Sequence, residues 1–222
     1  MDWTALNLSV KLSIITVLIL LPFGILLGRW LAFKQFPGKI FLQSLLALPL
    51  VLPPTVLGYY MLVMFSPNHG LGLWLSKLFN TSLVFSFEGL VLASIIFNLP
   101  FTIQPIQRAF NNIPAEIREA ALCCGLTPWQ TLWKIELPLA WPGIVLAMVM
   151  TFAHTLGEFG IVLMVGGNIP GKTQTIAIAI YDKVQSFDST SAASMSFILL
   201  LFSMLTISFS FWLSARHEKK YA

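Results

Sequence analysis

Five long apolar stretches set the main constraint on how this chain can fold. They cover residues 12–28, 40–65, 89–106, 139–165 and 195–213. A helix that crosses the hydrocarbon core of a bilayer needs about 20 mostly apolar residues, and these stretches meet or approach that length. Charged residues make up 10% of the chain, against roughly 25% in soluble domains. We therefore predict an all-α membrane protein with five transmembrane helices, forming a single domain over residues 1–222.

The basic residues predict how the spans are oriented. If the N-terminus lies outside, nine of the 13 Lys and Arg residues lie on the inner side and four on the outer side. Cytoplasmic loops of membrane proteins carry such an excess. This orientation places residues 111–138 and the C-terminus in the cytoplasm. We expect the first stretch to remain as a span rather than be cleaved, because Asp2 is the only charge before Lys11 and no small-residue cleavage site follows.

The interval 111–138 is polar and has the pattern of two short helices. Pro114 lies near the predicted start of the first helix and Gly125 just past its end, which follows the usual asymmetry of helix termini. Small residues on one face of this helix would let another protein surface come close. The residues of that face are Ile117, Ala120, Ala121 and Cys124.

A second short helix is predicted after Gly125. Thr127 can cap it, with Pro128 at its first position and Gln130 completing a capping box. Pro138 is expected to stop this helix where the fourth apolar stretch begins. The predicted unit of helix, glycine turn and helix is thus joined directly to a spanning helix, and such a geometry can transmit force.

The second apolar stretch is rich in residues that disturb helices. Pro49, Pro53, Pro54 and Gly58 lie within it, so a straight helix is not expected. One interpretation is a kinked helix used only for packing. The other is a bend that shapes a pathway or hinge, because irregular backbone at membrane depth is tolerated only inside protein or beside a water-filled cavity.

The fourth apolar stretch contains Glu158, the one acid well inside an apolar segment. An ionisable residue at this depth is a candidate for a functional site. The alternative is a structural glutamate, protonated or bonded to irregular backbone near Gly157 and Gly160.

No pattern in the sequence indicates catalysis, a cofactor or a metal site. Cys123 and Cys124 are adjacent, which suits neither a disulfide nor a zinc site, so we expect free thiols. His69, His154 and His217 are far apart in the sequence. No run of basic residues points to nucleic acid.

The spacing within 111–138 resembles a known family motif. Glu119-Ala120-Ala121, Gly125, Ile135 and Leu137-Pro138 match the EAA loop of ABC importer permeases at every spacing. Other segments look like the permease of molybdate transporters, namely FPGK at 36–39, LPLVLPP at 48–54, TLGEFG at 155–160 and NIPGKTQTI at 168–176. These blocks cover most of the chain.

This resemblance implies a fold, a location and partners. The expected fold is that of a type I ABC importer permease with a cytoplasmic coupling helix pair, in the plasma (inner) membrane of a prokaryote. The EAA residues are implied to engage a cytoplasmic ABC ATPase subunit. ATP hydrolysis is expected on that partner, since this chain has no G-x-x-x-x-G-K-[ST] sequence. An external molybdate-binding protein would deliver the oxyanion.

The expected assembly is a homodimer whose outer faces contact membrane lipid. Five helices are few to enclose a polar path, and one EAA loop engages one ATPase subunit, so a twofold dimer satisfies both constraints.

No Arg or Lys lies deep within the five stretches, which predicts a weak path for a dianion, built from hydroxyls, amides and helix N-termini. Candidates for this path or its gating are Pro53, Pro54, Thr151, Thr155 and Glu158. We assign Glu158 to local structure or gating, because its ionised form would repel the substrate.

Two alternatives to molybdate import remain open, beside a purely structural membrane scaffold, which would move no substrate and gives no account of the EAA motif. Sulfate or tungstate could be the substrate, because all tetrahedral dianions make similar demands on a pathway. A proton-coupled secondary transporter that uses Glu158 is a different class of protein, and the EAA spacing argues against it.

Overall fold

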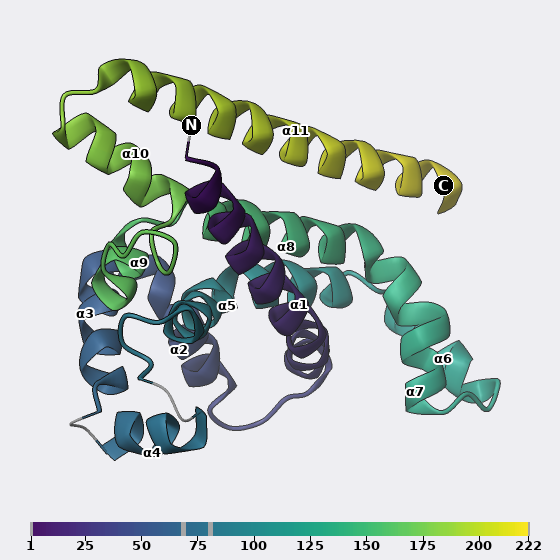
Figure 1. Cartoon of the computed structure of the whole chain (residues 1–222). Coiled ribbons are helices and arrows are strands. Elements are labelled where there is room, and N and C mark those ends of the chain that lie inside the picture. Colours follow the sequence, from purple (N-terminus) through teal and green to yellow (C-terminus); the bar gives the residue numbers. More distant parts are fainter. Residues whose placement is uncertain (1, 68–69, 80–81, 222) are drawn as a thin grey trace.

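The computed structural model describes residues 2–67, 70–79 and 82–221, and all regular secondary structure within these ranges is helical (Figure 1). This agrees with the predicted all-α class. In chain order the elements are α1 Trp3–Phe33, α2 Lys39–Val51, α3 Pro54–Phe65, α4 Gly70–Phe79, α5 Phe87–Asn111, α6 Ala115–Cys123, α7 Pro128–Thr131, the π-helical segment η1 Leu132–Glu136, α8 Leu137–Gly157, α9 Gly160–Gly166, α10 Ile176–Gln185 and α11 Ser189–Tyr221.

The apolar helices supply four candidate membrane spans, or five if one bent pair of helices is counted as a span. Within the described residues, four segments are long and apolar enough to span a bilayer, namely Trp3–Phe33, Phe87–Asn111, Pro128–Gly157 and Ser189–Ser208. Helices α2 and α3 pass the same test as a pair, although they are bent by 110° relative to each other. With this pair taken as one broken span, the number of spans matches the prediction.

The bend between α2 and α3 follows from two consecutive prolines. Leu52 has extended backbone, which is the conformation favoured before a proline. Pro54 opens α3 at its first position, where a missing N–H costs little. The carbonyl of Pro53 accepts hydrogen bonds from the N–H groups of Val56 and Leu57. The irregularity expected from the sequence is therefore a complete break rather than a kink.

The fourth stretch differs from the single segment 139–165 expected from the sequence. Helix α8 ends at Gly157, and the short helix α9 starts at Gly160. Between them Glu158 has extended backbone, with φ −68° and ψ 131°. Its carboxylate Oε1 accepts a hydrogen bond of 3.1 Å from the N–H of Ile161, so the side chain satisfies a free donor in the first turn of α9.

The start of this span also differs from expectation. Pro138 was predicted to stop the second cytoplasmic helix, and this prediction is wrong, because α7, η1 and α8 form one uninterrupted helical segment, Pro128–Gly157. In η1 the N–H of Leu137 donates to the carbonyl of Leu132, five residues back. The wider π-helical turn relieves the clash that a proline ring otherwise makes with the preceding turn.

Helix α5 forms the centre of the protomer. It packs against α1 and α8, and also against α9, α2 and α3. A Cβ atom added at Gly24 of α1 would lie 2.7 Å from Cγ2 of Thr102, and one at Gly143 of α8 would lie 2.4 Å from Cβ of Ala109. Glycine at these positions lets the backbones approach closely, as is common between membrane helices.

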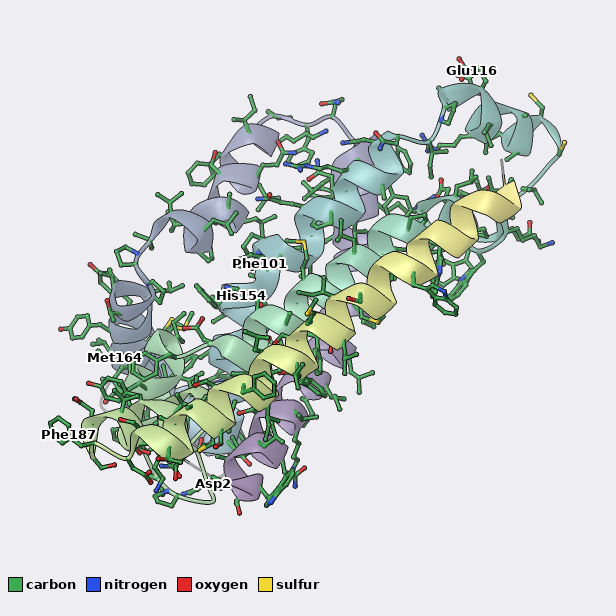
Figure 2. All side chains as sticks on the ribbon, turned by 90° about the horizontal axis from the view of Figure 1, so that it is seen from above. Asp2, Phe101, Glu116, His154, Met164 and Phe187 are labelled. Atoms are coloured by element: carbon green, nitrogen blue, oxygen red, sulfur yellow. The ribbon has the colours of Figure 1, made fainter. Side chains whose placement is uncertain are left out.

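The two ends of the molecule carry different elements. Figure 2 shows Glu116, on α6, at one end, and Asp2 and Phe187 toward the opposite end. The C-terminal end of α11 lies on the same side as α6 and α7 (Figure 1). At the other end the Oγ of Ser9 accepts a 2.8 Å hydrogen bond from the N–H of Ile176, which ties the start of α10 to α1.

Candidate coupling site and transport path

The loop between α6 and α7 is a defined turn. Gly125 has a positive φ of 75°, a conformation that glycine adopts without strain. The N–H of Gly125 donates to the carbonyl of Leu122, and the N–H of Leu126 donates to the carbonyl of Ala121. These two bonds form a Schellman motif, which confirms that Gly125 follows directly after the first helix.

A capping box starts the second helix, as predicted. The Oγ1 of Thr127 accepts from the N–H of Gln130 at 3.3 Å, and the Oε1 of Gln130 accepts from the N–H of Thr127 at 3.0 Å. Pro128 is at the first helical position. Because this helix continues through η1 into α8, a displacement of the turn at Gly125 moves the end of a spanning helix. We name the segment 115–136 the coupling unit.

The predicted coupling residues occupy different environments. Glu119, Ala120 and Gly125 are exposed, and Ile135, Leu137 and Pro138 are half-buried. Ala121 is buried, with 3% of its surface exposed. The expectation that Ile117, Ala120, Ala121 and Cys124 form one accessible face is therefore wrong for Ala121, which faces the interior of the protomer.

Large apolar side chains of the coupling unit are open to solvent in the isolated chain. Ile117, Leu122, Trp129 and Trp133 are 39%, 59%, 60% and 59% exposed, respectively. The rings of Trp129 and Trp133 lie edge to face, with centroids 6.0 Å apart. Tryptophan is enriched where proteins bind one another, so these residues fit a surface covered by a partner.

A buried carboxylate holds the end of the coupling unit that adjoins α8. Sequence analysis did not single out this residue. Glu136, whose side chain is fully buried, lies between two arginines that are 26% and 32% exposed, Arg29 of α1 and Arg118 of α6. Its Oε2 accepts a hydrogen bond from Nε of Arg29. Its Oε1 accepts from Nη2 of Arg29 at 3.2 Å and from Nε of Arg118 at 3.1 Å. Both carboxylate oxygens are thus satisfied by charged donors.

Further contacts extend this network. Arg29 also donates from Nη2 to the carbonyl of Pro128 at 3.3 Å. The guanidinium carbon of Arg118 lies 3.5 Å from the centre of the Phe33 ring, a cation–π distance. The network joins α1, α6, α7 and η1. A signal existed in the sequence, because Glu136 is an acid directly before an apolar stretch, but nothing in the spacing named its partners.

Two helix breaks lie next to each other in the structure. A Cβ atom at Gly160 would lie 2.9 Å from Cβ of Pro54, so the start of α9 touches the start of α3. Pro53 and Pro54 are exposed, whereas Glu158 is buried. The two segments with irregular backbone, 52–53 and 158–159, therefore form one region, which fits backbone that lines a cavity or is buried in protein.

The two threonines of the candidate path lie inside the protomer. Thr151 and Thr155 are each 1% exposed. The Oγ1 of Thr151 is 2.7 Å from the Oγ1 of Thr102 on α5, and the Oγ1 of Thr155 donates to the carbonyl of Thr151 at 2.7 Å. In this arrangement both hydroxyls bind protein groups: Thr151 joins α8 to α5, whereas the bond of Thr155 stays within α8.

A second polar contact joins the same two helices. The Nδ1 of His154 lies 3.1 Å from Oδ1 of Asn98. The His154 ring stacks on Phe101 with centroids 3.9 Å apart (Figure 2). Both partners belong to α5, so His154 takes part in packing between α5 and α8.

Comparison with known proteins gives consistent relatives. The chain is 41% identical to the molybdenum transport system permease protein ModB of Azotobacter vinelandii over 98% of this chain and 96% of that protein. It is 38% identical to the protein of the same name from Escherichia coli (strain K12), over 96% and 93% of the two chains. The sulfate transport system permease protein CysT of E. coli is more distant, at 33% identity over 83% of this chain and 66% of that protein.

A solved structure and a family model agree with these relatives. A bacterial alginate ABC transporter in complex with an alginate pentasaccharide-bound periplasmic protein contains a chain that matches with a TM-score of 0.78 at 19% identity, over 96% of this chain and 78% of that one. The fold is thus that of an ABC importer transmembrane subunit. Residues 21–221 match the model of binding-protein-dependent transport system inner membrane components. The chain belongs to this family.

Proposed function

We propose that this chain is the permease subunit of an ATP-driven molybdate importer, in which it forms the translocation path and couples it to a separate ATPase. One structural observation carries the coupling role, namely the exposed coupling unit that continues without interruption into the spanning helix α8. The choice of molybdate rests on 41% identity over 98% of the chain to a protein named as a molybdenum permease.

The proposed assembly contains two copies of this chain, two cytoplasmic ATPase subunits and an external oxyanion-binding protein. Each coupling unit would dock its exposed residues around Trp129 on one ATPase subunit. When ATP draws the two ATPase subunits together, the two coupling units move with them and α8 carries the motion into the membrane. Catalysis of ATP hydrolysis is assigned to the ATPase, and this chain needs no cofactor.

We assign the path to the region where the two helix breaks meet. Pro53 and Pro54 are exposed there, while Glu158 holds the start of α9 by accepting from Ile161. Thr151 and Thr155 are buried next to this region, and we assign them to packing, because their hydroxyls bond to Thr102 and to the carbonyl of Thr151. Glu158 is thereby given a structural or gating role rather than contact with the anion.

Reconstitution tests this function directly. Proteoliposomes with the permease, its ATPase and its binding protein should show ATP hydrolysis and uptake that rise several-fold with molybdate. Stimulation by sulfate alone would assign the importer to sulfate. Uptake driven by a proton gradient in the absence of ATP would contradict the ABC function and favour the secondary transporter.

The orientation is a separate prediction, with the N-terminus outside and the C-terminus in the cytoplasm. The two cysteines of the chain, Cys123 and Cys124, are both exposed on the coupling unit. In the absence of the ATPase, a membrane-impermeant maleimide should therefore label inside-out vesicles and leave right-side-out vesicles unlabelled. A C123S/C124S variant gives the background signal. Labelling of right-side-out vesicles at the rate seen after permeabilisation would invert the topology.

A further inference from the structure

Two neighbouring cavities border the C-terminal half of α5, near the coupling unit. One lies between α5 and α8 and the other between α2 and α5, and both are lined by Gln104 and Arg108. We name the second cavity the α2–α5 groove. Its polar lining residues are Gln43, Ser44, Gln104, Gln107, Arg108 and Asn111.

The lining of the groove is suited to an anion. Within the part of the chain that the structure describes, no Asp or Glu lines either cavity. Its polar groups are amides, a hydroxyl and one guanidinium, which together offer many N–H donors. Lys39 adds a positive charge one helical turn before Gln43 on α2.

Arg108 is available for a ligand. Its side chain is exposed, and among the described residues it makes no ion pair or side-chain hydrogen bond, unlike Arg29 and Arg118. The spacing of Gln104, Arg108 and Asn111 places all three on one face of α5, which is the face turned to α2. The cation therefore lies among donors and has no carboxylate to neutralise it.

The polar lining of the α2–α5 groove is unfavourable next to the hydrocarbon of lipid. Among the residues of α2, all of which the structure describes, only Pro49 is buried, so the groove is open in the isolated chain. Several amides and a guanidinium facing hydrocarbon would each lose their hydrogen bonds to water. Because Arg108 lies in the last turn of α5, the groove is expected to face water, lipid headgroups or a partner protein rather than hydrocarbon.

We propose that the α2–α5 groove is a low-affinity exit site for tetrahedral oxyanion dianions, at the end of the path nearest the coupling unit. This inference rests on the proposed function and names residues that the sequence did not select. Arg108 supplies charge and the amides supply donors. One arginine leaves a dianion only partly neutralised, which keeps binding weak, as release requires.

Cysteine accessibility tests the groove without relying on transport. In a C123S/C124S background, S44C places a thiol in the groove at little change in size. The full complex in proteoliposomes is treated with a negatively charged and a positively charged methanethiosulfonate. The ratio of the two rates measured with a small uncharged thiol free in the same buffer supplies the reference.

We expect the ratio of anionic to cationic reaction rates at S44C to exceed the reference by about fivefold, the effect of a nearby cation partly screened by water. Adding R108Q should bring the ratio to within about twofold of the reference, whereas K134Q, which removes a cation outside the groove, should not. Millimolar molybdate should slow labelling of S44C. The proposal would be overturned if S44C reacts with neither reagent, or if R108Q leaves the ratio of anionic to cationic rates unchanged. Arg108 would then serve only to orient the chain in the membrane.

Transport separates this inference from the proposed function. R108Q should lower molybdate uptake by roughly tenfold and R108K should restore most of it, because lysine keeps the charge without the forked donors. If R108Q transports molybdate at the normal rate, the exit site is wrong and the importer function stands. If the unaltered complex moves no molybdate, the function fails, while the labelling ratios still report whether the groove selects anions.

Discussion

The E136Q variant should lose at least nine-tenths of ATP-driven uptake and become markedly less stable. Glutamine keeps the shape of Glu136 but leaves Arg29 and Arg118 facing each other without a negative charge. Breaking a buried ion pair costs about 3–5 kcal/mol. Since the two arginines are 26% and 32% exposed, water screens part of this repulsion, and we expect about 2–3 kcal/mol. Thermal unfolding in detergent and uptake in proteoliposomes measure the two effects.

Two variants make this test specific. E116Q removes an exposed charge from the same helix as Arg118 and should change stability by less than about 0.5 kcal/mol. R118Q should be milder than E136Q, because the two hydrogen bonds between Arg29 and Glu136 remain. An E136Q protein with normal melting and normal uptake would show that the network is dispensable.

The G125E variant should insert and fold but fail to bind the ATPase. No atom lies within 4 Å of a Cβ built at Gly125, so a side chain there projects away from the protomer. The positive φ adds strain of about 1–2 kcal/mol, confined to an exposed turn. Co-purification of the ATPase should fall by more than tenfold, while helical content by circular dichroism stays unchanged.

Comparison of three substitutions separates strain from docking. G125A carries the backbone strain with a small side chain, and G125N carries less strain with a larger one, because asparagine tolerates this conformation. A docking surface predicts that binding weakens with side-chain size. G171E serves as the control, since Gly171 also has a positive φ, of 72°, and open space around it but belongs to a different loop. Normal ATPase binding by G125E would contradict the docking role.

Local features of the coupling unit were predictable because they depend on neighbours in the sequence. Glycine is the usual residue where a helix ends in a left-handed conformation, as it does at Gly125. The pattern of Thr127 followed by Gln130 is typical of a capping box. The break at Pro53 was also foreseeable in kind, since two prolines cannot continue a helix. Each of these expectations involves residues fewer than five positions apart.

Features set by tertiary contact were not predictable in the same way. The partners of Glu136 lie 107 and 18 residues away, and no periodicity marks such a pairing. Ala121 lies on the expected face of its helix, but only packing decides which part of that face is covered. Irregular backbone near Gly157 and Gly160 was one of two interpretations of Glu158, but the span was still drawn as one segment, 139–165, because apolar composition does not distinguish one long helix from two.

Helix α1 connects the two ends of the protein through one continuous helix of 31 residues. Arg29 fixes one end to the coupling unit, and Ser9 holds the first N–H of α10 at the other. The 20 residues between them correspond to a rise of about 30 Å. If a ligand bound at the end that carries α10 favours one tilt of α1, then by thermodynamic reciprocity an ATPase bound at the coupling unit must favour or disfavour that ligand by the same factor. The affinity of that end for its partner should therefore depend on which nucleotide the ATPase holds.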